Sequence, residues 1–104
     1  MMYRQGDVLL IPVDQIPAGC TKVARTNGRI ILAEGEVTGH AHAIASREAE
    51  LHEDDLGQRF LRVLVEGGVK LRHEEHATIT LPRRDYIVRR QREYTPEAIR
   101  NVQD

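Results

Sequence analysis

The stretch TKVARTNGRIILA, residues 21–33, carries the strongest fold signal in the sequence. Asn27 and Gly28 both tolerate a positive φ, which the tight type I′ turn of a two-residue hairpin requires. Residues typical of strands flank this pair on both sides. The stretch therefore predicts a hairpin, with one strand through residues 21–25 and its return through residues 29–33.

Runs with strand character continue outward from this hairpin in both directions. They cover residues 7–13, 40–44, 59–65, 69–73, 76–81 and 86–94. Pro12 must lie at the end or the edge of its strand, because proline cannot donate to a sheet ladder. The run 86–94 is so polar that we expect it at a sheet edge or along a groove. The acidic stretch from Glu48 to Gly57 is predicted to be a loop.

A helix signal occurs only near the C-terminus. Thr95 suits an N-cap, Pro96 suits the first helical position, and Glu97 suits the positive end of the helix dipole. We expect a short helix from there through Val102. The predicted fold class is all-β: residues 1–104 form a single domain, a small barrel or jelly-roll with this short C-terminal helix.

The composition is that of a globular domain. The 104 residues suffice for one core, and 40% are hydrophobic and 30% charged. No apolar run approaches the roughly 18 residues of a membrane span, and the N-terminus reaches charged residues too early for a signal peptide. We therefore expect a cytoplasmic protein with no membrane partner. Cys20 is the single cysteine, so a bound metal would need nitrogen and oxygen ligands.

Four of the five histidines form two close pairs, and the first pair is His40 and His42. On a strand these two side chains project to the same face with Cβ atoms roughly 6–7 Å apart. Two imidazoles at that spacing can share one ion. His40 and His42 are therefore predicted metal ligands, whereas His52, within the acidic stretch, is predicted to be a surface residue.

The second pair is His73 and His76, separated by Glu74 and Glu75. A two-residue turn between them would put the apolar residues of one strand on the threonine face of the next. We therefore expect a looser bend. His73 continues the inward series of its strand and is the better ligand of the two, and Glu74 or Glu75 are alternatives to His76.

The segment GEVTGHAH, residues 35–42, followed by Glu48, resembles the first metal-binding motif of the cupins, in which a glycine precedes an HxH pair and a glutamate follows. The resemblance implies a β-barrel and Glu48 as a further metal ligand. In the second cupin motif Pro82 matches, but Tyr86 stands where the family has a histidine. His73 or His76 would then supply that ligand from an earlier strand.

Imidazole and carboxylate ligands without a thiolate suit a divalent transition metal, and zinc, nickel, iron and manganese are all compatible with them. An open coordination position would permit catalysis and a small-molecule ligand at the metal, whereas a closed site would be structural. The sequence shows no nucleophile paired with a base, so metal-assisted chemistry is the one enzymatic class it supports. Whether the protein is an enzyme stays open.

The competing function is a non-enzymatic module that binds RNA, DNA or a protein partner through the C-terminal strand. Basic and aromatic residues that can hold phosphates and stack on bases lie there: Arg83, Arg84, Tyr86, Arg89, Arg90, Arg92 and Tyr94. The formal net charge of −1 argues against nucleic acid. We expect a solvated edge, or the interface of a homodimer, since charged edge strands commonly prevent aggregation.

Overall fold

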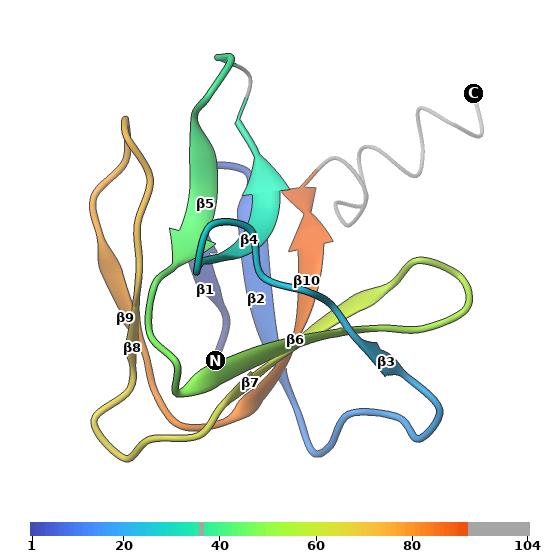
Figure 1. The fold of residues 1–104 in the computed structure, drawn as a ribbon. Coiled ribbons are helices and arrows are strands. Elements are labelled where there is room, and N and C mark those ends of the chain that lie inside the picture. Colours follow the sequence, from blue (N-terminus) through green and yellow to red (C-terminus); the bar gives the residue numbers. More distant parts are fainter. Residues whose placement is uncertain (36, 92–104) are drawn as a thin grey trace, which may run out of the picture.

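The computed structural model describes residues 1–35 and 37–91, and the regular elements that it describes are ten strands (Figure 1). They are β1 (Tyr3–Gln5), β2 (Val8–Val13), β3 (Thr21–Lys22), β4 (Ile30–Glu34), β5 (Ala41–Ile44), β6 (Ala49–Glu53), β7 (Arg59–Val63), β8 (Val69–Leu71), β9 (Ile79–Leu81) and β10 (Asp85–Arg90). The predicted all-β class is confirmed. The helix predicted from Thr95 to Val102 lies outside the described residues.

No helix long and apolar enough to cross a membrane occurs in the described part of the chain.

Six strands form one antiparallel sheet in the order β1-β2-β10-β7-β6-β3. β1 and β3 are its two edges and do not pair with each other, so the sheet stays open within residues 1–35 and 37–91. Of the predicted barrel or jelly-roll, a closed barrel is not formed by the described strands, because closure requires the edge strands to pair. Only the coarser prediction, a small all-β domain, is confirmed.

The remaining strands form two antiparallel pairs, β4 with β5 and β8 with β9. The pairs meet where Ala43 and Arg72 exchange two backbone hydrogen bonds of 2.9 Å each. β5 thereby runs beside β8, to one side of the large sheet in Figure 1. This contact between distant parts of the chain positions the histidines.

The core is formed by apolar side chains from both groups of strands. Members with no more than 3% exposure include Val8, Leu10, Ile30, Leu32, Ile44, Leu51, Leu61, Leu71, Leu81 and Tyr86. The hydroxyl of Tyr86 donates a hydrogen bond of 2.7 Å to the carbonyl of Pro82, which satisfies a polar group that burial would otherwise penalise. Burial raises the pKa of Tyr86 to about 12. Pro12 lies in the half of β2 that pairs with β10 alone, as its lack of an N–H requires.

The Asn27-Gly28 turn is confirmed, but its flanking strands do not pair with each other as predicted. Both residues have positive φ, 53° and 80°, and Thr26 and Arg29 exchange backbone hydrogen bonds of 2.8 and 3.0 Å. Beyond this bridge the chain diverges, because β3 pairs with β6 while β4 pairs with β5. The turn thus redirects the chain from one sheet to the other group of strands.

Two further predictions about strands are corrected. Residues 49–53, expected within an acidic loop, form β6 between β3 and β7, because Ala49 and Leu51 point into the core while Glu50 and His52 point outward. The arginine-bearing strand β10, expected at an edge or along a groove, is not an edge strand but lies between β2 and β7, and its Val88, Arg89 and Arg90 line a pocket. Its polar residues fit there because they meet partners on neighbouring elements, as Asp85 does with Arg62 at 3.1 Å.

Candidate functional site

The contact between β5 and β8 brings His42 and His73 together. Ala43 and Arg72 form a hydrogen-bonded pair, so His42 and His73 occupy the adjacent non-hydrogen-bonded position, where cross-strand side chains lie closest. Their ring centroids are 4.3 Å apart. Two histidines separated by thirty-one positions in the sequence are therefore cross-strand neighbours.

His76 joins them from the loop of residues 72–78 that connects β8 to β9. Its ring centroid lies 4.7 Å from that of His73 and 6.0 Å from that of His42. The register Leu71 opposite Ile79 leaves a long loop between the two strands, which confirms the looser bend expected around Glu74 and Glu75. We call the three rings of His42, His73 and His76 the histidine site.

Gln5 fixes the protonation of the buried His42 ring. The amide nitrogen of Gln5 donates to the carbonyls of Leu71, at 2.8 Å, and Ala77, at 2.9 Å, so its oxygen faces Nδ1 of His42 at 3.0 Å. An amide oxygen only accepts, so Nδ1 of His42 carries the hydrogen. The lone pair of a neutral His42 is consequently on Nε2, which is the arrangement that a second-shell partner gives a metal-ligating histidine.

Asp7 faces this lone pair. Its Oδ1 lies 3.9 Å from Nε2 of His42, and its Oδ2 accepts a hydrogen bond of 2.7 Å from Arg90. Burial opposes ionisation of Asp7, but the hydrogen bond and charge of Arg90 lower its pKa below the ordinary value. Burial first, and then the charge of His73, lower the pKa of His42 to about 4. At neutral pH the site therefore offers a neutral imidazole beside a carboxylate.

Two glycines leave room for the other two imidazoles. A Cβ atom at Gly6, whose φ is +60°, would lie 2.7 Å from Nε2 of His76, and one at Gly35 would lie 2.9 Å from Nε2 of His73. Any larger residue would displace these rings. The rings border a pocket of about 280 Å³ that Asp7 and Arg90 also line.

His40 lies beside the pocket and does not line it. β5 begins at Ala41, and the His40 ring meets the edge of His73 with 6.0 Å between centroids. Its Nδ1 is buried without a hydrogen-bond partner among the described residues, and Oε2 of Glu75 is 3.6 Å away. Oε1 of Glu74 accepts a hydrogen bond of 3.0 Å from the amide of Ala41, so this carboxylate holds the start of β5.

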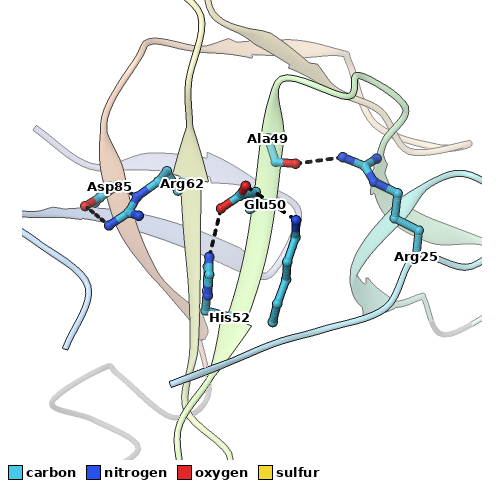
Figure 2. Close-up of polar contacts among 7 residues, drawn as sticks. Arg25, Ala49, Glu50, His52, Arg62 and Asp85 are labelled. Carbon is cyan, nitrogen blue, oxygen red and sulfur yellow. Dashed lines mark hydrogen bonds and ion pairs between the residues drawn. The ribbon is translucent and has the colours of Figure 1, made fainter. Parts of the chain in front are cut away.

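The structure separates Glu48 and His52 from the histidine site. Glu48 is exposed on the loop after β5, where its backbone bonds to Ser46 and Leu64. His52, expected in a mobile acidic segment, lies on β6 with its Nε2 3.1 Å from Oε1 of Glu50, as Figure 2 shows. Neither residue borders the pocket near His42.

The side chains of the histidine site do not converge on one position that an ion could occupy. Within residues 1–35 and 37–91, no group of three or more His, Cys, Asp or Glu side chains is arranged to hold a metal ion. Nδ1 of His73 accepts a hydrogen bond of 3.0 Å from the Glu75 amide, so its Nε2 carries the proton when the ring is neutral. His73 and His76 belong to the largely exposed loop 72–78. His76 is itself exposed, whereas the half-buried His73 packs against the rings of His40 and His42.

Sequence reasoning missed Gln5 and Asp7. Gln5 ends β1 and Asp7 lies in the turn before β2, both far from every histidine in the sequence, and neither is spaced in a way that signals a ligand. Gly6, with its positive φ, marks the turn that carries them. A turn glycine alone does not reveal which distant strand its neighbours will face.

The model of a family described as Domain of unknown function (DUF8820) matches residues 4–91. The chain belongs to this family. No curated protein and no solved structure matches the chain. All residues of the histidine site, together with Gln5 and Asp7, fall inside the matched range.

Proposed function

We propose that this domain binds one divalent transition-metal ion through His42, His73 and His76, with Asp7 as a carboxylate ligand. The observation that carries the proposal is the chain of hydrogen bonds through Gln5, which directs the lone pair of His42 toward Asp7. Fixed partners of this kind hold the ligand ring in its tautomer and orientation and raise its basicity.

The distance between His42 and Asp7 suits two ligands of one ion after a small movement. Two donors on one tetrahedral ion, each bonded at 2.0–2.2 Å, lie about 3.4 Å apart. Nε2 of His42 and Oδ1 of Asp7 are 3.9 Å apart, so a metal ion would draw them together by about half an ångström. Rotation of the exposed His76 would supply one further nitrogen, and His73 would supply another once its ring releases the Glu75 amide from Nδ1.

Nitrogen and carboxylate donors suit zinc, nickel, iron or manganese. His40, predicted from its strand spacing with His42, and Glu48, implied by the resemblance to cupins, fall outside the set proposed here, because neither lines the pocket. Of the ligands that the first cupin motif implies, only His42 of the HxH pair then remains in the proposed set. His76 is exposed, so a small molecule can approach the metal and metal-assisted catalysis is compatible with the site. A cytoplasmic location stays a prediction.

The direct test is metal analysis of tag-free protein. After supplementation with zinc, nickel, iron(II) or manganese in separate samples and removal of free metal, at least one of these ions should remain at about one per chain. Isothermal titration of chelator-treated protein with that ion should give the same stoichiometry. Retention near zero for all four ions would refute the proposal.

The nucleic-acid alternative has weaker support in the structure. Tyr86 has no exposed surface and cannot stack on a base. Of the candidate arginines, Arg90 pairs with Asp7 and Arg83 with Glu66, whereas Arg89 bonds to the neutral Gln58 and Arg84 is exposed. Arg92 and Tyr94 lie outside the described residues. A homodimer through a free edge of the large sheet stays a prediction.

A further inference from the structure

A second hollow shares Arg90 with the histidine pocket but has different walls. It lies among β4, β10 and the loop that joins β6 to β7, and its volume is about 480 Å³. This size falls within the range of pockets that take small organic molecules. Its lining includes Leu32, Leu56, Arg59, Val88, Arg89 and Arg90, and we call it the arginine groove.

The arginine groove has a small net positive charge once ion pairs are taken into account. Arg59, Arg89 and Arg90 are the charged residues that line it in the described part of the chain. Asp7 pairs with Arg90 at 2.7 Å, and Oε2 of Glu53 lies 3.7 Å from Nε of Arg59. Within residues 1–35 and 37–91, these two carboxylates leave one positive charge of the groove uncompensated.

That charge resides on Arg89. Its guanidinium donates one hydrogen bond, of 2.9 Å, to the side-chain oxygen of Gln58, and it has no carboxylate partner among the described residues. The amide nitrogen of Gln58 in turn donates to Asp54 at 3.0 Å, so a neutral amide separates Arg89 from that acid. A guanidinium held in this way keeps donors for a planar anion.

Apolar surface completes the arginine groove. Leu32, with 3% exposure, and the partly buried Val88 contribute side chains to the wall. Leu56 is 86% exposed at the rim. The Asp54 carboxylate holds its loop in place by accepting hydrogen bonds from the amides of Leu56 and Gln58, at 2.9 and 2.8 Å. An exposed leucine on a braced loop offers contact area to an apolar group entering the groove.

We propose that the arginine groove binds a small organic monocarboxylate, with the carboxylate on Arg89 and an apolar body against Leu32, Val88 and Leu56. One uncompensated charge matches a monoanion better than a phosphate dianion, and the planar fork of a guanidinium matches a carboxylate. This binding does not require the metal ion, since none of the three metal-binding histidines lines the groove.

The test uses chelator-treated full-length chain, so that no carboxylate can bind through a metal. Titration with 2-naphthoate, followed by calorimetry or by amide chemical shifts, should saturate at one site per chain. Uncharged 2-naphthalenemethanol should bind at least about tenfold more weakly, because a charge-assisted hydrogen bond to Arg89 is lost. Naphthyl phosphate should also bind more weakly than 2-naphthoate.

Variants locate the binding. Arg89→Gln should weaken 2-naphthoate about tenfold, whereas Arg89→Lys, which keeps the charge, should weaken it less. The control Arg84→Gln removes an exposed arginine that does not line the groove and should bind like wild type. Leu56→Ser, at an exposed position that leaves the core intact, should weaken 2-naphthoate without affecting acetate.

Three outcomes would overturn the proposal. One is the absence of saturable 2-naphthoate binding at millimolar concentration. A second is equal weakening by Arg84→Gln and Arg89→Gln, which would indicate diffuse attraction to surface charge. The third is binding of the alcohol or the phosphate as tightly as the carboxylate.

Discussion

His42 on β5 and His52 on β6 are the same residue type in opposite chemical settings. His42 is 2% exposed, and its Nδ1 meets the neutral amide of Gln5. The half-buried His52 meets the carboxylate of Glu50 (Figure 2). This carboxylate also accepts a hydrogen bond from Lys22. The hydrogen bond with His52 lowers the pKa of Glu50 below its usual range.

The difference shows what makes a histidine available as a ligand. An amide that fixes one ring nitrogen leaves the lone pair of the other free, and two further imidazoles lie near that lone pair in His42. In His52, Nε2 meets the Glu50 carboxylate at 3.1 Å, which leaves the lone pair of Nδ1 free in the same way. The difference lies in the neighbouring imidazoles of His73 and His76, which contact His42 and, among the described residues, do not contact His52. Environment, more than residue type, therefore separates the two histidines.

The largest expected effect is on metal affinity. His42→Ala should weaken binding of the preferred ion by about a thousandfold, because it removes the one ligand that is already oriented. His52→Ala should leave the affinity within about twofold of wild type, since His52 pairs with Glu50 on another strand. Competition with a chromophoric chelator measures both. Similar losses in the two variants would mean that metal binds diffusely to surface histidines.

The next effect is on the pH dependence of stability in metal-free protein. The pKa of folded His42 is about 4 and its ordinary value is 6.5, so between these values the unfolded chain binds a proton that the folded chain does not. Stability should therefore fall as pH decreases through this window. The contribution of His42 between pH 6.5 and 5 is on the order of 2 kcal/mol.

Urea unfolding at pH 6.5 and 5 checks this expectation. His42→Gln should flatten the dependence, because the titrating group is gone, and His52→Gln serves as the control that retains it. An unchanged slope in His42→Gln would show that other groups cause the acid sensitivity.

A smaller effect is expected from the partner of His42. Gln5→Met keeps the length of the side chain but removes the acceptor for Nδ1 and both amide donors. Metal affinity should fall by about tenfold, as when the outer partners of other metal-binding histidines are removed. Glu50→Gln changes the partner of His52 in a comparable way and should leave metal affinity unaltered. Retention of full affinity in Gln5→Met would remove Gln5 from the account.

The smallest effect concerns the space around His73. Gly35→Ala introduces a Cβ atom 2.9 Å from Nε2 of His73. This should weaken metal binding by about threefold, which corresponds to about 0.7 kcal/mol of binding free energy. Gly67→Ala is the matched control, because a Cβ atom there meets nothing within 4 Å and neither glycine has a positive φ. Equal affinities in the two variants would show that His73 moves without hindrance.

The sequence predicted the strands that are apolar throughout. It failed where charged residues masked the alternation of apolar and polar positions. The segment of β2 is apolar throughout, and the loose bend after β8 follows from keeping Leu71 on the inner face. β6 was missed because Glu50, His52 and Glu53 gave it the composition of a loop, although Ala49 and Leu51 alternate with them. β10 was expected at an edge or along a groove: the edge was wrong, because its polar residues meet partners on neighbouring elements, but its Val88, Arg89 and Arg90 do line the arginine groove.

The site was predictable only in part, because it depends on contacts between distant segments. The sequence identified His42, His73 and His76 by their pairing, but spacing alone could not show that Ala43 would meet Arg72 and set His42 against His73. Gln5 and Asp7 reach the site only through the turn at Gly6 between β1 and β2. Local patterns contain no information about such contacts.

The most direct test of the central claim is a long-range ¹H–¹⁵N correlation spectrum of the imidazole nitrogens at pH 7.5, before and after addition of one equivalent of the bound metal, with zinc as the diamagnetic choice. Before addition, His42 should show a protonated Nδ1 and a bare Nε2, as its bond to Gln5 requires. After addition, ring nitrogens of His42, His73 and His76 should shift while those of His52 stay in place. A hydrogen on Nε2 of His42, or an unchanged His42 signal when zinc is bound, would contradict the account.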